Sequence, residues 1–204
     1  MDVPVTAAPV LTDGRSVVLR PHLESDLAAI VEQGNDPDMV RFTTVPRPYR
    51  IADAREFLSS AHTAWAQPTS TATRIWAITV IIDGVEQFAG SIDYRPTGHG
   101  TATVGYGLHP GHRGRGLMTD ALGLVIDWAF CNDGQQLLHW RAVVGNWASA
   151  KTAWRNGFRL EGRVRGLCVQ PDGVSDGWIA TLHRDDPREP TCPWPWAVEV
   201  PELS

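Results

Sequence analysis

Apolar residues along the chain follow two kinds of spacing, one typical of helices and one typical of strands. Helical spacing, with apolar residues three or four positions apart, occurs in four segments. These predicted helices run over residues 25–34, 51–65, 117–131 and 148–156. Around them lie apolar or alternating runs that predict strands at residues 17–19, 75–82, 85–94, 101–108, 137–144, 160–169 and 178–182.

Turn residues separate these elements. Asp83-Gly84 stands between two strand-like runs and favours the type I′ turn of a hairpin, because glycine tolerates positive φ. Pro21 ends the first strand, since proline cannot donate to a ladder, and Gly157 follows the last predicted helix as its C′ residue. The order is strand, two helices, three strands, helix, strand, helix, two strands. It predicts an α+β fold with a mixed, mostly antiparallel sheet of six to seven strands and about four helices.

Length and composition indicate one globular domain. The chain has 204 residues, of which 43% are hydrophobic and 20% are charged. Its longest apolar run covers only residues 75–82, whereas a membrane span needs roughly 18 apolar residues, and the N-terminal segment lacks a basic-then-apolar signal pattern. We therefore expect a soluble, cytoplasmic protein without a membrane partner.

Charge and cysteine content argue against further classes. The formal net charge is −5, so a nucleic-acid-binding surface is not expected. Every basic residue except Lys151 is an arginine, which binds phosphate well through paired hydrogen bonds, so any phosphate site would be local. The cysteines Cys131, Cys168 and Cys192 are odd in number and far apart, so neither a disulfide framework nor a zinc site is expected.

The segment 104–121 carries the most informative chemistry. A strand with Gly105 and Gly107 leads into the turn His-Arg-Gly-Arg-Gly at 112–116, which opens the strongest predicted helix. Glycine inside a strand indicates a bulge or a close approach to the backbone. At a helix start, four backbone N–H groups lack partners and the dipole adds positive charge, so a phosphate or pyrophosphate fits there.

Two common phosphate loops do not fit this turn. A Walker loop needs GxxxxGK followed by Ser or Thr, which does not occur, and a dinucleotide GxGxxG beginning at Gly114 would need glycine at Thr119. The competing interpretation is a tight connection with solvated arginines and no ligand.

The residues around the turn resemble a known signature. The run from His112 to Met118 is similar to the acyl-CoA motif (Q/R)-x-x-G-x-(G/A) of the GNAT N-acetyltransferases, and the flanking Gly-Tyr-x-Leu and Thr-Asp-Ala resemble the RimJ/RimL-type branch. Residues 146–158 and 161–176 are similar to the N-x-x-S…G-F element and the terminal hairpin of that family. The resemblance covers about residues 15 to 184. We expect these to form a single GNAT-like domain, with residues 1–14 as an N-terminal extension and residues 185–204 as a Pro/Trp-rich tail.

This resemblance implies an N-acetyltransferase that transfers acetyl from acetyl-CoA, its cosubstrate, to a primary amine such as a protein N-terminus or a small molecule, without a metal. In that family the sheet splays between its fourth and fifth strands, and pantetheine lies in the gap. The resemblance implies that Leu108 and Asn146 contact pantetheine and that Ser149 protonates the leaving thiolate. The remaining implied CoA-binding residues belong to the turn and its flank: His109, Arg113, Gly114, Arg115, Gly116, Leu117 and Met118.

Some positions depart from the family's pattern. Met118 stands where glycine or alanine is usual, so we expect its side chain to point away from the phosphates or the loop to shift. Ala102 or Thr103 stands where relatives often have a carboxylate as general base, and Ala153 stands where many have a tyrosine as general acid. The base is therefore unassigned. An α-amine, with a reference pKa of roughly 7.7–8.0 against about 10.4 for lysine, could manage with water or a weak base.

Simpler roles compete with these assignments. Asn146 could only cap the helix that follows it, Ser149 could be an ordinary first-turn serine, and His109 and His112 are expected to be solvated. Asp93 could be the base, but the favoured interpretation is an exposed strand carboxylate. For the whole protein, the alternatives are a non-catalytic CoA-binding sensor or scaffold and a binder of another phosphorylated ligand.

The tail has its own pattern. Its five prolines exclude regular pairing, yet Trp194 and Trp196 are costly to leave in water. We therefore expect the tail to dock against the domain or against a second subunit of a homodimer.

Overall fold

The computed structural model describes residues 8–67 and 69–196. Eight strands form one sheet in the order β1-β2-β3-β4-β5-β6-β8-β7. β5 and β6 pair in parallel, and all other neighbours pair antiparallel. The strands are β1 Leu11–Thr12, β2 Val18–Arg20, β3 Arg74–Ile82, β4 Val85–Gly98, β5 Thr101–Leu108, β6 Leu137–Val143, β7 Arg159–Gln170 and β8 Gly173–His183.

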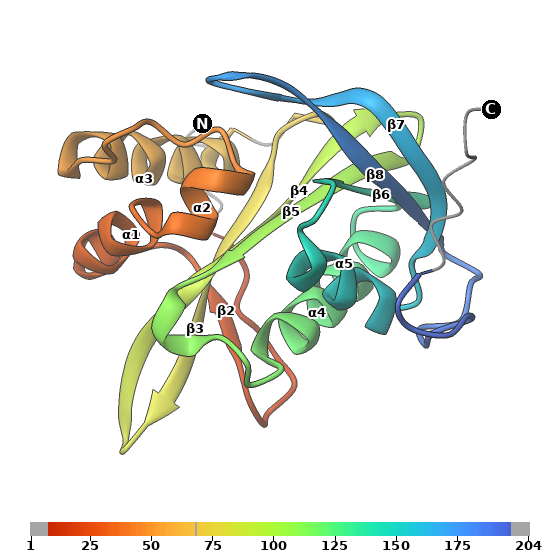
Figure 1. Cartoon of the computed structure of the whole chain (residues 1–204). Coiled ribbons are helices and arrows are strands. Elements are labelled where there is room, and N and C mark those ends of the chain that lie inside the picture. Colours follow the sequence, from red (N-terminus) through yellow and green to blue (C-terminus); the bar gives the residue numbers. More distant parts are fainter. Residues whose placement is uncertain (1–7, 68, 197–204) are drawn as a thin grey trace.

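Five helices cover the two faces of this sheet. α1 to α3 lie on one side, and α4 and α5 lie on the other (Figure 1). Short 3-10 turns, η1 Glu24–Asp26 and η2 Pro110–His112, precede α1 and follow β5. The predicted α+β class with a mixed, mostly antiparallel sheet is therefore confirmed. The helices are α1 Leu27–Gly34, α2 Pro37–Phe42, α3 Ile51–Ala66, α4 Leu117–Cys131 and α5 Trp147–Arg155.

The described chain has one strand and one helix more than the pattern predicted, eight strands instead of six to seven and five helices instead of about four. Both additions are too short to show a period. β1 has two residues and pairs with β2, so the sheet begins inside the segment expected to be an N-terminal extension. α2 has six residues, and its start is defined by capping, because the Asp36 side chain accepts from the N–H groups of Asp38 and Met39.

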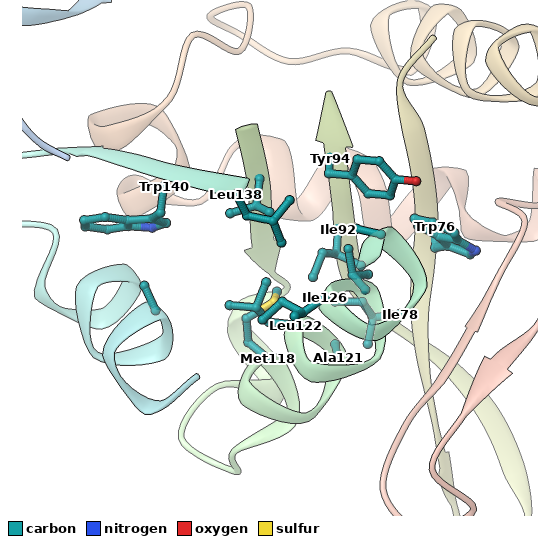
Figure 2. Packing of buried hydrophobic residues seen from close by; sticks show 14 of the residues in the cluster. Trp76, Ile78, Ile92, Tyr94, Met118, Ala121, Leu122, Ile126, Leu138 and Trp140 are labelled. Carbon is teal, nitrogen blue, oxygen red and sulfur yellow. The ribbon is translucent and has the colours of Figure 1, made fainter. Parts of the chain in front are cut away.

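α4 begins and ends at the predicted residues, Leu117 and Cys131. Its apolar stripe packs against the inner residues of β3, β4 and β6, as Figure 2 shows. Met118 belongs to this stripe and is 6% exposed, so its side chain points into the core and leaves the turn free. The first of the two outcomes expected for Met118 is therefore correct.

The sheet opens between β5 and β6. The two strands pair only from Thr101 to Val104 with Leu137 to Trp140, and beyond these residues each strand pairs only with its other neighbour. The edge of β5 from Gly105 to Leu108 therefore faces a gap. This is the predicted splay between the fourth and fifth strands, which are β5 and β6 when the short β1 is not counted.

The tail docks against the domain as far as residue 196. Trp196 is 3% exposed and contacts Trp140, and the indole N–H of Trp154 on α5 donates to the carbonyl of Cys192 at 2.8 Å. Docking against the domain, the first of the two alternatives, is thus confirmed for this part of the tail. Residues 197–204 lie outside the described chain, as do residues 1–7 of the expected extension.

Candidate active site

The turn between β5 and α4 exposes a cluster of unpaired backbone donors. Gly114 and Gly116 have φ angles of 76° and 81°, in the left-handed region that favours glycine. Within the described chain, no group accepts a hydrogen bond from the backbone N–H groups of residues 114–118. These donors lie at the positive end of the α4 dipole, so the turn can bind an anion such as a phosphate.

Arg113 joins this turn to α2. Its guanidinium donates to Asp36 and Asp38 at the start of α2, and to the carbonyl of Leu108 at 3.3 Å. Burial raises the pKa of Asp36, but the hydrogen bonds from Arg113 and from the α2 N–H groups outweigh it, and the pKa lies below the usual value. The Arg113 side chain therefore positions α2 beside the turn.

Other basic side chains are available for an anion. Arg115 is exposed and makes no ion pair within the described residues. Lys151 and Arg155 lie four residues apart on α5 and line the cavity beside the turn. The sequence interpretation missed this pair. Their spacing indicates one helix face, but only the fold shows that this face turns towards the phosphate-binding turn.

His109 and His112, the two histidines beside the turn, are less exposed than the prediction of solvated side chains implies. His112 is 8% exposed, because the 3-10 turn at Pro110–His112 folds its ring inward, so the prediction is wrong for this residue. Burial is the largest cause that lowers the pKa of His112, and the neighbouring His109 and Arg115 lower it further. The Nδ1 of His109 accepts from the Gly111 N–H, and its Nε2 lies 3.1 Å from Glu32.

A cavity of about 410 Å³ opens between the turn, the end of β5, α2 and α5. All the predicted site residues except His109 and Arg115 line it. The structure therefore brings together most of a set that is scattered over more than forty positions of the chain. Those lining residues are Leu108, Arg113, Gly114, Gly116, Leu117, Met118, Asn146 and Ser149.

A second cavity, of about 460 Å³, reaches the same place from the other side of the splay. Its walls come from β4, β5, β6, β7, the start of α5, and the end of α2 with the segment after it. The two cavities share five lining residues, Phe42, Thr43, Tyr106, Asn146 and Ser149. A group held in one cavity can therefore reach a group held in the other at the position of Ser149.

Ser149 is fixed by three neighbours. Asn146 caps α5 by accepting from the Ser149 N–H at 3.2 Å, as one of the simpler interpretations proposed, and it also lines both cavities. The Tyr106 hydroxyl donates to the Ser149 carbonyl at 2.8 Å, and burial raises the pKa of Tyr106. The Trp140 indole N–H donates to the Ser149 hydroxyl oxygen at 3.0 Å. Sequence reasoning included Tyr106 only in the Gly-Tyr-x-Leu motif and did not single out Trp140, which has the pattern of an ordinary core residue.

Asp93 is buried, so the expectation of an exposed strand carboxylate is wrong. It pairs with Gly105 across the β4–β5 ladder, and the missing side chain of Gly105 leaves room for the carboxyl group. Asp93 is 8% exposed, and burial raises its pKa to about 6 despite the Arg95 guanidinium at 3.0 Å. It does not line the second cavity, whereas Arg95 and Gly105 do.

The described residues contain neither a metal-binding cluster nor a membrane-spanning helix. No three His, Cys, Asp or Glu side chains are grouped there as a metal site would require. No helix of the described chain is long and apolar enough to span a membrane. The three cysteines are free.

Comparison with curated proteins identifies one relative, which matches only part of this chain. The probable N-acetyltransferase YjcK of Bacillus subtilis (strain 168) is 35% identical over 88 residues. The match covers 42% of this chain and 48% of the relative, so the two proteins are aligned over only about half of that relative's length.

Solved structures share the fold at low identity. Mycobacterium smegmatis RimJ with a CoA disulfide has a TM-score of 0.72 and 18% identity, covering 89% of this chain and 88% of that one. RimL, a ribosomal L7/L12 alpha-N-protein acetyltransferase with coenzyme A, has a TM-score of 0.73 and 18% identity, and the match covers 86% of this chain and 98% of RimL. The microcin C7 self immunity acetyltransferase MccE with acetyl-CoA and AMP has a TM-score of 0.71 and 20% identity, and the match covers 83% of this chain and 93% of MccE.

A sequence model of one domain family spans most of the fold. The acetyltransferase (GNAT) domain matches residues 16–159, from just before β2 to the beginning of β7. The matched segment contains the splay, the donor-rich turn and Ser149. This chain therefore belongs to the GNAT acetyltransferase family.

Proposed function

We propose that this protein is a RimJ/RimL-type N-acetyltransferase that transfers acetyl from acetyl-CoA to a primary amine, such as a protein N-terminus or a small-molecule amine. The observation that carries the proposal is the meeting of two cavities at Ser149. A transfer reaction needs two ligands whose reacting atoms come into contact, and two cavities with a common wall provide that arrangement.

The first cavity suits coenzyme A in three respects. The unpaired N–H groups of residues 114–118 match a pyrophosphate, and Lys151 and Arg155 add positive charge. The edge of β5 from Gly105 to Leu108, which pairs with no strand on the side of β6, offers backbone groups to an extended chain with amide bonds, such as pantetheine. RimJ, RimL and MccE, which share the fold, were solved with CoA or acetyl-CoA.

The reaction breaks the C–S bond of a thioester while a C–N bond forms, and bound acetyl-CoA would supply the thioester. Ser149 can give its hydroxyl proton to the departing sulfur, because it lies where the two cavities meet. Unpaired N–H groups on β5 can stabilise negative charge on the carbonyl oxygen. Loss of the amine proton is left to water, which favours α-amines because their pKa is lower than that of lysine.

The second cavity would hold the amine and has a charge preference. Arg95 and Arg141 are the charged residues in its described lining, which contains no acidic side chain. Arg141 has no ion-pair partner among the described residues. We therefore include in the proposal an acceptor that carries an anionic group, such as a carboxylate, near its amine.

The test is a screen of thiol release from acetyl-CoA with matched amines. Acceptors are α-amino acids, N-terminal peptides with acidic, neutral or basic second residues, and the same peptides with a blocked N-terminus and a free lysine. Turnover with free α-amines, highest for acidic ones, is the expected result. CoA binding without turnover on any amine would favour the sensor or scaffold alternative, and binding of another nucleotide but not CoA would remove the assignment of the first cavity.

A further inference from the structure

The Ser149 hydroxyl is oriented by a partner outside the GNAT signature. Trp140 on β6 is 1% exposed, and its indole nitrogen lies 3.0 Å from the Ser149 Oγ. An indole N–H is only a donor, so Oγ must be the acceptor in this bond. The Ser149 proton therefore points away from Trp140 and is free to be donated elsewhere. No described group accepts a hydrogen bond from the Ser149 Oγ.

A donated hydrogen bond also changes the chemistry of the hydroxyl. When Ser149 gives up its proton, negative charge develops on Oγ, and the Trp140 N–H stabilises that charge at a partly buried position. The indole thereby makes Ser149 a better proton donor. Because Trp140 lies on the α5 side of the sheet (Figure 2), the bond joins β6 directly to the first turn of α5.

The position of Trp140 depends in turn on the C-terminal tail. The Trp196 ring packs against the Trp140 ring with centroids 5.7 Å apart and an interplanar angle of 62°. Trp196 is 3% exposed, so the contact lies in the interior. Its own indole N–H has no partner in the described chain, which indicates that Trp196 contributes by packing.

The tail also holds the helix that carries Ser149. Trp194 packs against Trp147 and Trp154 of α5, with ring centroids 6.0 and 5.3 Å away. The Trp154 N–H donates to the Cys192 carbonyl at 2.8 Å. The tail therefore contacts both partners of the bond between β6 and α5, the indole through Trp196 and the helix through Trp194.

We propose that Trp140 is a positioning residue that directs the Ser149 proton towards the leaving sulfur, and that Trp196 of the C-terminal tail fixes the Trp140 indole for this role. The proposal rests on the proposed function for the identity of the leaving group. A purely structural bond would fill the hydrogen-bonding need of a buried indole and leave the reactivity of Ser149 unchanged.

The central test compares Trp140→Phe with Trp178→Phe. Phenylalanine keeps an aromatic ring and removes the N–H. Trp178 is a matched control, because it is 2% exposed, lies on β8 beside β6 and has an indole N–H without a partner in the described chain. We expect Trp140→Phe to lower kcat about five- to tenfold with little change in the KM for acetyl-CoA. Trp178→Phe should keep the wild-type kcat.

A titration provides a readout that does not need turnover. In the CoA complex, a hydroxyl that donates to sulfur stabilises the thiolate, so the thiol pKa of bound CoA should lie below that of free CoA. It is measured by thiolate absorbance, with the desulfo-CoA complex as the blank for the three cysteines. We expect Trp140→Phe to raise this pKa by about half a unit to one unit, and Trp196→Leu to raise it by less.

The outcomes separate the two proposals. An unchanged thiol pKa and kcat in folded Trp140→Phe would overturn the inference, even if the wild type is an active acetyltransferase. Wild-type protein without turnover would remove the proposed function, while a thiol pKa raised by Trp140→Phe would still support the inference. If Trp140→Phe does not fold, the Trp140 indole N–H resonance in Ser149→Ala decides, because an unmoved resonance would show that the bond is absent.

Discussion

At the scale of single residues, the Ser149 hydroxyl has two roles, one towards the ligands in the cavities and one towards the Trp140 indole. Its hydroxyl lines both cavities and also accepts from the buried Trp140 N–H. Removal of the hydroxyl therefore affects both reactivity and stability.

We expect Ser149→Ala to reduce kcat about 10²- to 10⁴-fold while the Kd for CoA stays near the wild-type value, because a leaving-group acid acts in the transition state. The unpaired indole should also cost about 1–3 kcal/mol of stability. Steady-state kinetics, CoA titration and a thermal melt measure the three quantities. Ser60→Ala, an exposed serine on α3, is the control. Wild-type turnover in Ser149→Ala would leave this serine a helix residue without a catalytic role.

The raised pKa of Asp93 predicts that ionisation of its carboxyl group lowers the stability of the folded protein. Its carboxyl has a pKa of about 6 in the folded protein against 3.8 for an unperturbed aspartate. The folded state thus binds more protons than the unfolded state between these values, so stability falls as the pH rises through this window.

Asp93→Asn should therefore raise Tm at pH 7.5, and the gain should vanish at about pH 3, where the carboxyl group is protonated in both states. Asp176→Asn should instead lower Tm at pH 7.5, because the Arg163 and Gly166 hydrogen bonds lower the pKa of that carboxyl group and stabilise its charged form. Calorimetry of both variants across this range is the measurement. A Tm gain for Asp93→Asn that is equal at both pH values would contradict the assignment.

Arg141 gives a prediction about acceptors. If it binds an anionic group of the amine, Arg141→Gln should raise the KM for acidic acceptors about tenfold, since one charge-assisted hydrogen bond is lost. A neutral amine of the same size is the internal control and should keep its KM. Equal effects on both acceptors would remove the charge preference of the second cavity.

At the scale of elements, the turn before α4 combines a backbone conformation with a set of donors. Gly116 has positive φ and opens the helix, and proline there would fix φ near −65° and remove one N–H. We expect Gly116→Pro to weaken CoA binding at least about tenfold in isothermal titration.

Gly84→Pro is the matched control for this substitution. Gly84 also has positive φ, 77°, but lies at the tip of the β3–β4 hairpin and lines neither cavity. Both variants should lose stability, whereas only Gly116→Pro should lose CoA affinity. Unchanged affinity in folded Gly116→Pro would exclude the turn as the pyrophosphate site.

At the scale of the whole molecule, the tail is part of the core. It contributes Trp196 to the main hydrophobic cluster, an ion pair from Asp186 to Arg159, and the guanidinium of Arg188 over the Phe130 ring. Gly157 belongs to the same contact, because a side chain there would meet the carbonyl of Pro187.

Truncation after Arg184 should therefore lower Tm, with the loss of Trp196 burial alone worth about 2–3 kcal/mol. The tail tryptophans should also give blue-shifted fluorescence in the intact chain. Thermal melts and size-exclusion chromatography compare the two forms. An unchanged Tm would contradict the docking, and a changed elution volume would show that the tail acts between subunits.

The sequence alone determined the elements with strong periodicity and the chemistry of one turn. α4 and β5 begin and end where their patterns predicted, and the Asp83-Gly84 turn has both residues at positive φ. These features depend on neighbours a few positions away, so local spacing contains the information. The short β1 and α2 were missed because their stability comes from pairing and capping.

Contacts between distant parts of the chain follow from tertiary packing and have no local signal in the sequence. Asp93 is buried because it faces Gly105 on the next strand, and Arg113 binds α2, whose position along the chain gives no sign of the contact. The two cavities exist because β5 and β6 separate after Val104, a consequence of the packing of whole elements. Trp140, Ser149 and Trp196 come from a strand, a helix and the tail, and their contacts form only when all three fold onto one core.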